Sequence, residues 1–317
     1  MLRRFLIAAL FTGCAAFAPS AAAQTKMIVG FPPGQATELA ARVLAEGLTR
    51  EMGSPVVVVN MPGQGGSIAL AALINSPADG SVITVSALAA YAINPHLYSS
   101  VRYNSLKDVA PVALVADIPV VLVVNPAVKA TNLKELVALA KADPGALMHS
   151  SSGNGTVSHL GMVDLKRRLG IEMTHVPYAG SGRAMTDLMG GRVHVGLDSV
   201  AAVKSFIEAG KLRAIGAASH KRLPSLPDLP TLHELGVRDF EVVAWTAVSV
   251  PAATPLPIRE KLSAAVTKIV SSKEFADRMA PLGMEPRPGG IQAFDSLLRS
   301  EYERWAKVVK ESGAKVD

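Results

Sequence analysis

Short apolar segments alternate with segments of helical spacing along most of the chain. Residues 26–31 form a short apolar run, which is typical of a buried strand. In residues 37–52 the apolar positions recur at intervals of three and four, which indicates an amphipathic helix. The β-branched run of residues 56–59 indicates a second strand. Strands and helices that alternate with short connections predict an α/β fold with mostly parallel sheets, covered by helices on both faces.

The same alternation continues towards the C-terminus. It predicts strands at residues 82–86, 120–124, 147–150, 173–176, 193–197, 212–217 and 242–250, and helices at residues 68–75, 133–142, 161–169, 184–189, 257–271 and 291–310. The chain length fits about two domains. Apolar strands near residues 120 and 245 are natural places for the chain to cross between two lobes. The proline-rich residues 223–230 predict an extended surface connection, because proline fits neither a helix interior nor a central strand.

The first 23 residues have the layout of a secretory signal. Arg3 and Arg4 give a basic start, residues 5–17 form a short apolar stretch, and residues 21–23 are alanines of the kind found at cleavage sites. We therefore expect export, cleavage near Ala23 and a mature chain that starts at Gln24. Two alternatives are a retained N-terminal helix and a lipoprotein anchored through Cys14.

Composition and charge exclude several classes of protein. Only 18% of the 317 residues are charged and 49% are hydrophobic, which excludes a disordered chain. After the first 23 residues no apolar run reaches the roughly 18 residues needed to cross a bilayer. Cys14 is the only cysteine, so the mature chain without it has neither a disulfide scaffold nor a cysteine nucleophile. The formal net charge of +6 has no basic cluster beyond residues 166–168, so nucleic acid is not indicated as a partner.

Three connections share one design, in which a strand runs into a small-residue turn that opens a helix. They read FPPGQAT at residues 31–37, PGQGGS at 62–67 and SSSGNGTVSH at 150–159. Such turns lie beyond the carboxyl ends of strands, where glycine permits close approach and free helix-start amides attract anions. Two or three of them around one ligand predict micromolar carboxylate binding, about −8 kcal/mol, without an arginine. The alternative is that they are ordinary turns and helix caps.

Patterns that indicate catalysis are scarce. The chain has no G-x-S-x-G, P-loop or H-E-x-x-H motif. His149, His159 and His175 match no compact metal motif, and we interpret them as core or hydrogen-bonding residues, with His159 as a cap of the third loop. Asp198 ends a predicted strand, where it would accept from a ligand amine or hydroxyl or lie solvated in a loop. The main alternative function is a secreted α/β hydrolase or nucleotide-dependent enzyme that uses His159 or His175.

Several segments carry a resemblance to a known family. They read IVGFPPG at residues 28–34, VVVNMPGQGG at 57–66, ADG at 78–80, SSGNGTVSHL at 151–160 and HVPYAG at 175–180. In these segments the chain resembles the Bug-type extracytoplasmic solute receptors, the substrate-binding components of tripartite tricarboxylate transporters. The resemblance implies a type II periplasmic-binding-protein fold, with one lobe of residues 24–123 and 249–317 and another of residues 124–248. It also implies a monomeric periplasmic receptor that passes a small carboxylate to membrane subunits, with no catalytic residue, cofactor or metal.

The resemblance further implies which residues meet the solute. The loop of Pro33 and Gly34 would hold one carboxylate from the first lobe, the loop of residues 151–159 would bind from the second, and Asp198 would lie near the distal end. The expected binding residues are Phe31, Pro33, Gly34, Gln35, Glu38, Gln64, Gly65, Ser86, Ser151, Ser152, Gly153, Asn154, Gly155, Thr156, Ser158, His159 and Asp198.

The chain departs from the family pattern within these loops. Gln35 stands where a second glycine is usual, Glu38 where aspartate is usual, and Gln64 where alanine is common. The bulk of Gln35 and Gln64 should reshape the pocket, so the identity of the solute does not follow from the resemblance. A ligand-sensing partner of a membrane receptor is the second alternative function.

Overall fold

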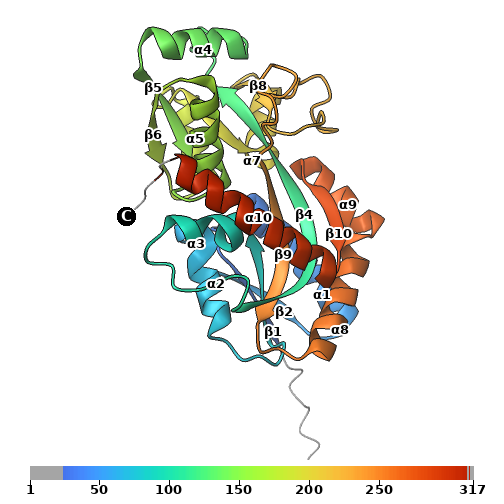
Figure 1. The fold of residues 1–317 in the computed structure, drawn as a ribbon. Coiled ribbons are helices and arrows are strands. Elements are labelled where there is room, and N and C mark those ends of the chain that lie inside the picture. The colour runs from blue at the N-terminus through green and yellow to red at the C-terminus, as the bar shows by residue number, and fades with distance from the viewer. Residues whose placement is uncertain (1–23, 313, 315–317) are drawn as a thin grey trace, which may run out of the picture.

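The described chain forms two α/β lobes joined by long strands (Figure 1). The structure is a computed structural model that describes residues 24–312 and 314. The predicted secretory signal and Cys14 lie outside these residues. Among the residues that are described, no helix combines the length and apolarity needed to span a membrane.

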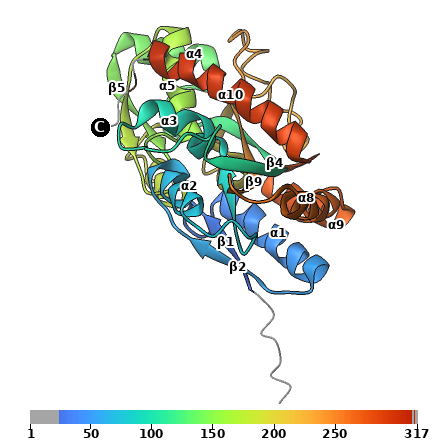
Figure 2. The ribbon, with the colours of Figure 1, turned by 60° about the horizontal axis from the view of Figure 1, so that its bottom comes forward.

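The first lobe is built on three parallel strands, as the apolar runs near the N-terminus predict. Strand β1 lies between β2 and β3. The N-terminal elements are β1 (Thr25–Val29), α1 (Ala36–Met52), β2 (Val56–Asn60), the 3-10 turn η1 (Gln64–Gly66), α2 (Ser67–Ile74), β3 (Val82–Ala87), the π-helical turn η2 (Ala89–Ile93) and α3 (Asn94–Leu97). The C-terminal elements are α8 (Leu256–Val270), α9 (Lys273–Met279), η3 (Ala280–Leu282), β10 (Glu285–Gly289) and α10 (Ile291–Ser312). Helices α1, α8 and α9 pack together on one side of this lobe (Figure 2).

The second lobe repeats the design with its own sheet. Strand β5 pairs in parallel with both β6 and β7. Its strands are β5 (Gly145–Ser151), β6 (Met173–Pro177), β7 (Val195–Ser199) and β8 (Arg213–Ala217), and its helices are α4 (Leu133–Ala142), α5 (Val157–Leu169), α6 (Ser181–Met189) and α7 (Val200–Glu208). Helices α5, α6 and α7 closely follow β5, β6 and β7, so the carboxyl ends of these strands lead into helix starts.

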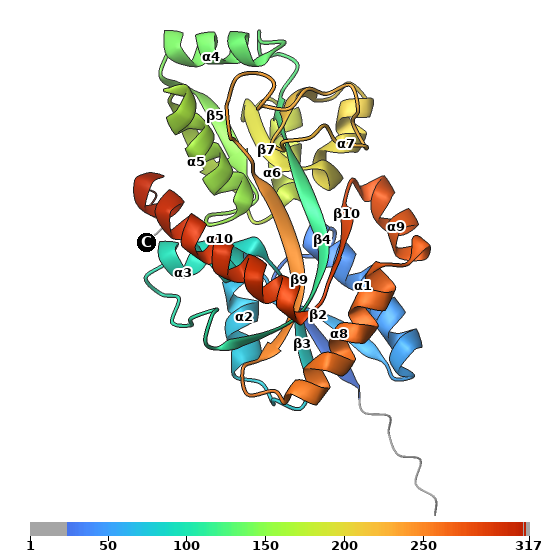
Figure 3. The ribbon, with the colours of Figure 1, turned by 45° about the vertical axis from the view of Figure 1, so that its right-hand side comes forward.

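Two strands run between the lobes, near the places where apolar runs predict crossovers (Figure 3). Strand β4 (Val109–Val124) has 16 residues, nearly all buried, and β9 (Val243–Pro251) runs antiparallel to it from the Val109↔Pro251 pair to the Pro119↔Val243 pair. Beyond Pro119, β4 pairs with β7 and β8 of the second lobe. One continuous strand is therefore a member of both sheets.

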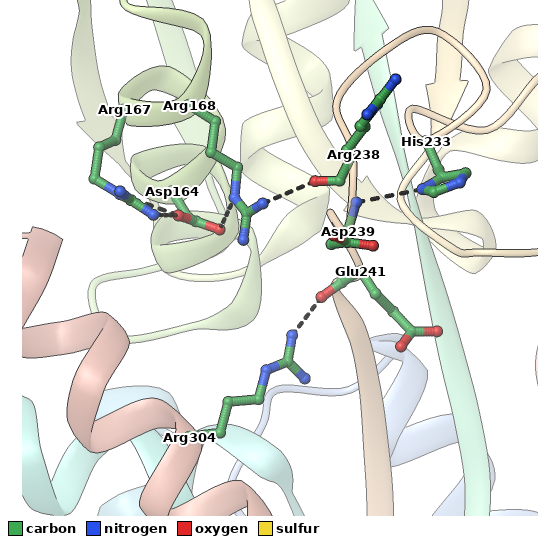
Figure 4. A network of polar contacts seen from close by, with 8 residues as sticks. All are labelled: Asp164, Arg167, Arg168, His233, Arg238, Asp239, Glu241 and Arg304. Atoms are coloured by element: carbon green, nitrogen blue, oxygen red, sulfur yellow. Dashed lines mark hydrogen bonds and ion pairs between the residues drawn. The ribbon is translucent and has the colours of Figure 1, made fainter.

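Helix α10 crosses the front of the molecule and reaches the second lobe (Figures 1 and 3). Its Arg304 donates from Nη2 to the carbonyl oxygen of Glu241, just before β9, at 2.6 Å. Arg168 of α5 reaches the same segment, where it donates to the Arg238 carbonyl at 3.0 Å and to Asp164 on its own helix at 2.7 Å (Figure 4). The C-terminal helix is thus tied to the segment that leads from the second lobe back to the first.

Several helices and strands were not predicted, or only in part, from the spacing of apolar residues. The prediction limited to residues 120–124 covers only the end of β4, and α7, α9 and β10 were not predicted. Helices α7 and α9 span only nine and seven residues, which is too short for a clear helical period. Strand β10 reads EPRPG and pairs only with β4, and prolines are tolerated on such an edge strand. Residues 223–230 contain turns and no helix or strand.

Candidate functional site

A small cavity of about 60 Å³ lies between the two lobes. Both lobes and both crossover strands contribute to its wall, which is formed by Phe31, Gln35, Ala36, Thr37, Ala87, Ala89, Ile118, Val120, Ser152, Thr156, Val157, Ser158, Ser181, Asp198, Ser199 and Ala244. We call this space the inner cavity.

The first turns of two helices, one from each lobe, open onto the inner cavity. The N-cap of α1, Gln35, makes no side-chain cap hydrogen bond, and the amides of Ala36 and Thr37 have no acceptor within the helix. In α5 the N-cap Thr156 accepts from His159 N, which leaves the amides of Val157 and Ser158 without an acceptor within their helix. Because helix starts carry partial positive charge, the two ends together favour an anion between them.

The side chains of the inner cavity supply hydroxyls and one acid. Among the described residues, no lysine or arginine lines it, and its only ionisable side chain is Asp198. Asp198 accepts from Ser181 Oγ at 2.9 Å and from Ser199 N at 2.7 Å. Burial raises the pKa of Asp198 to about 6, because these hydrogen bonds offset only part of the desolvation. An anion in this cavity is held by amides and hydroxyls, and Asp198 disfavours a second negative charge beside it.

A larger outer cavity of about 690 Å³ shares Phe31, Gln35, Ser152 and Thr156 with the inner one. Other predicted site residues in its wall are Gln64, Gly65, Gly153 and Asn154, and further wall residues include Tyr98, Tyr178 and Arg183. The second glycine loop therefore reaches only the outer cavity. A ligand in the inner cavity has room to extend outwards along this wall.

The lobes touch each other at the rim of these cavities. Tyr98 of the first lobe donates from Oη to the carbonyl oxygen of Asn154 at 2.9 Å. Gln35 donates from Nε2 to Ser181 Oγ at 3.4 Å. The structure is therefore a closed arrangement, in which the two loops that bound the inner cavity are held against the opposite lobe.

Several residues predicted to contact the solute line neither cavity. They are Pro33, Gly34, Glu38, Ser86, Ser151, Gly155 and His159. Gly34 N donates to Glu38 Oε2 at 2.9 Å, and the buried Glu38 also forms an ion pair with Arg42. The amide of Gly34 is therefore hydrogen-bonded to a side chain of α1. Ser86 is fully buried. Gly155 N likewise donates to His159 Nδ1 at 3.3 Å. Of these residues, Pro33 and Gly34 are exposed, and the others are buried behind the wall.

Other wall residues were not singled out from the sequence. The first turns of α1 and α5 contribute Ala36 and Val157, which lie inside the predicted loops, so the loop pattern could have pointed to them. Ile118, Val120 and Ala244 come from the crossover strands, whose apolar pattern is identical to that of a core strand. No sequence signal separates these three from the core.

Replacing Glu38 tests its supporting role. We expect Glu38→Ala to lower the free energy of unfolding by about 1–3 kcal/mol, because the Gly34 amide and Arg42 lose their acceptor. Glu38→Gln keeps an acceptor oxygen for Gly34 N and should lose less. Urea unfolding at pH 7 measures both. Equal stability of Glu38→Ala and the parent protein would contradict the assignment.

Comparisons with known proteins identify the family of this chain. Residues 40–314 match the family model for the tripartite tricarboxylate transporter family receptor. The chain belongs to this receptor family. Protein BugT of Bordetella pertussis is 36% identical over 323 residues, which cover 100% of this chain and 99% of BugT.

Solved structures confirm the two-lobe α/β fold. The Rhodopseudomonas palustris protein Rpa4515 with adipate is 32% identical, with a TM-score of 0.88 and coverage of 92% of this chain and 98% of that one. MatC from the same organism, with bound malate, is 30% identical, with a TM-score of 0.85 and coverage of 90% and 99%. The predicted resemblance to Bug-type receptors is confirmed by these matches.

Family membership also decides between the alternatives. These proteins are periplasmic receptors that bind small carboxylates and work with membrane components of a transporter. The relatives are solute receptors and not enzymes, which decides against a secreted hydrolase or nucleotide-dependent enzyme. The receptor function predicted from the loops and the resemblance is therefore confirmed.

Proposed function

We propose that this receptor binds a small mono- or dicarboxylate in the inner cavity, with one carboxylate group between the first turns of α1 and α5. The observation that carries the proposal is the convergence of these two helix starts, from opposite lobes, on a cavity wall without lysine or arginine among the described residues. Each helix start contributes about 0.3–2 kcal/mol, and charge-assisted hydrogen bonds about 1.5–3 kcal/mol each. The sum reaches the roughly −8 kcal/mol of micromolar binding.

The distal part of the solute faces two different environments. Towards Asp198 the cavity favours a group of the solute that carries no negative charge. A hydroxyl or an amine can donate a hydrogen bond to the carboxylate of Asp198. Towards the outer cavity there is room for a longer chain or a second carboxylate, past Gln35 and along the loop of Gly153. The adipate and the malate of the two R. palustris structures support dicarboxylates as the first candidates.

The proposal also covers export, removal of the signal peptide and the oligomeric state of the mature receptor. A chain of this family needs export, and the sequence of residues 1–23 supports removal of a signal peptide near Ala23. We propose that the mature receptor acts as a monomer that closes its lobes around the solute and presents the closed form to its membrane subunits.

A thermal-shift screen tests the proposed ligand class. The panel holds L-malate, adipate, benzoate, L-aspartate and L-glutamate, with glucose and ammonium chloride as controls. At one hundred times Kd a ligand adds about 2.7 kcal/mol, which should raise the melting temperature of a chain of this size by roughly 4 °C. We expect this shift with at least one carboxylate. A shift with glucose or ammonium and with none of the acids would overturn the proposal.

A further inference from the structure

Three histidine rings form a stack behind the loop of residues 151–156 in the second lobe. His175 of β6 lies between His149 of β5 and His159 of α5, with ring centroids 4.8 Å and 4.2 Å away and interplanar angles of 18° and 9°. None of the three lines the inner or the outer cavity. The proposed binding of a carboxylate does not use them directly, so their place calls for another explanation.

Two of the rings hold the two glycines of the loop. Gly155 donates its amide to Nδ1 of His159 at 3.3 Å. Gly153 donates its amide to Ser151 Oγ at 3.3 Å, and the same hydroxyl lies 2.7 Å from Nε2 of His175. Each glycine is thus anchored on an imidazole, one directly and one through Ser151.

These glycines need such anchors because they bring no side chain of their own. Their φ angles are +137° at Gly153 and +72° at Gly155. Glycine adopts positive and negative φ about equally readily, so the backbone alone does not hold this conformation. The segment between them includes Asn154, whose carbonyl oxygen meets Tyr98 of the opposite lobe. The conformation of this backbone segment therefore sets the position of the first turn of α5 relative to the inner cavity.

The chemistry of the contact fixes the state of the ring. A backbone amide only donates, so His159 must keep Nδ1 unprotonated to accept from Gly155. Burial, with His175 and Lys166 nearby, lowers the pKa of His159 to about 3, and burial with Lys166 lowers that of His175 to about 4. The groups that face the stack are these rings, His149 and Lys166, whose ammonium donates to the Met173 carbonyl at 2.9 Å. The stack therefore stays neutral, and its acceptor persists, throughout the neutral pH range.

A metal site does not explain the stack. Rings that lie face to face direct their nitrogens in parallel and not towards a common point. In the described part of the chain, no group of three or more histidine, cysteine, aspartate or glutamate side chains is placed to hold a metal ion.

We infer that His159 and His175 are positioning residues for ligand binding: they fix the backbone of Gly153 and Gly155, and through it the start of α5, without touching the solute. The inference rests on the proposed function for its effect on affinity. Its structural half, the anchoring of the two glycines, can be measured without any ligand.

Paired amide substitutions test the inference, because the two rings use different nitrogens. The Oδ1 or Nδ2 of asparagine falls near the position of Nδ1 of histidine, and the amide end of glutamine falls near Nε2. We expect His159→Asn to keep affinity within about threefold and His159→Gln to weaken it at least tenfold. At the other ring the order reverses, with His175→Gln close to the parent protein and His175→Asn at least tenfold weaker. Calorimetric titration with adipate and with L-malate supplies the affinities.

Amide hydrogen exchange of the ligand-free protein supplies the independent readout. Gly155 should exchange at least tenfold faster in His159→Gln than in His159→Asn, and Gly153 at least tenfold faster in His175→Asn than in His175→Gln. His194→Gln is the matched control, since His194 also accepts a backbone amide at Nδ1, that of Met148 at 2.9 Å, away from the loop. It should leave affinity and both glycine exchange rates unchanged.

The outcomes separate the two proposals. If the wild-type protein binds neither acid, the choice of dicarboxylate fails while glycine exchange still decides the anchoring. If asparagine and glutamine act alike at each position, or the glycine exchange rates do not move, the positioning role is refuted. Should a histidine variant fail to fold, Ser151→Ala takes its place, because it removes the acceptor of Gly153. Unchanged Gly153 exchange and unchanged affinity in that variant also refute the inference.

Discussion

Gly155→Ala is expected to weaken carboxylate binding by about 10- to 100-fold, equivalent to about 1.4–2.8 kcal/mol. A Cβ at this position would lie 2.4 Å from Asn94 Oδ1 and 2.7 Å from Tyr98 Cε2, both in the opposite lobe. Asn94 cannot yield easily, because its Nδ2 donates to the Gln64 carbonyl at 2.6 Å and to Ser67 Oγ at 2.9 Å. The added methyl group therefore opposes closure of the lobes and leaves the open form intact.

Gly170→Ala is the matched control for this variant. Gly170 has φ +60°, close to the +72° of Gly155, but a Cβ there meets nothing within 4 Å. Both alanines carry a similar backbone strain of roughly 1–2 kcal/mol, so only Gly155→Ala adds the contact between lobes. Calorimetric titration with the best acid from the thermal-shift screen measures the difference. Equal affinities in the two variants would remove the closure argument.

Lowering the pH from 7 to 5 is expected to reduce the free energy of unfolding by roughly 4 kcal/mol. Burial lowers the pKa of His149 to about 2, of His159 to about 3 and of His175 to about 4, whereas the unfolded chain protonates its histidines near pH 6.5. Below that pH the unfolded state binds more protons than the folded state. Each ring therefore lowers the free energy of unfolding by about 1.4 kcal/mol per pH unit. Asp198 works in the opposite direction below pH 6 and offsets part of the loss, because its pKa is raised in the folded state.

Urea unfolding at pH 7, 6 and 5 measures this dependence, and a leucine variant assigns part of it. His149 is fully buried, so His149→Leu should remove about a third of the histidine contribution. A parent protein that is equally stable at pH 5 and pH 7 would show that the stack accepts protons when folded.

The alternation of strands and helices could be predicted from the sequence because each lobe repeats one simple unit. Apolar runs such as residues 26–31 and 56–59 correspond to β1 and β2, and the turn at Gly34 does lead into α1. The loops of residues 31–37 and 150–159 do meet at one cavity, since both follow parallel strands and open helices. This part of the site follows from topology alone.

The assignment of individual contacts could not be predicted. The sequence predicts free amides at Gly34 and Gly155 beside two helix starts. It does not show that Glu38 and His159, four residues later, accept from these amides. That outcome depends on the rotamers of two side chains. Nor does the sequence show that the loop at Gly65 stays at the outer cavity, because that follows from the packing of η1 beside β1, where Gly30 lies directly against Gly66.

The shared strand β4 bears on how the molecule comes apart. Its first part pairs with β9 and β10, and its last five residues pair with β7 and β8. Unfolding of either lobe therefore removes hydrogen-bond partners of β4, which also belongs to the sheet of the other lobe. Neither half can be cut out as a fragment with a complete sheet, and we expect the chain to unfold in one cooperative transition although it has two hydrophobic clusters.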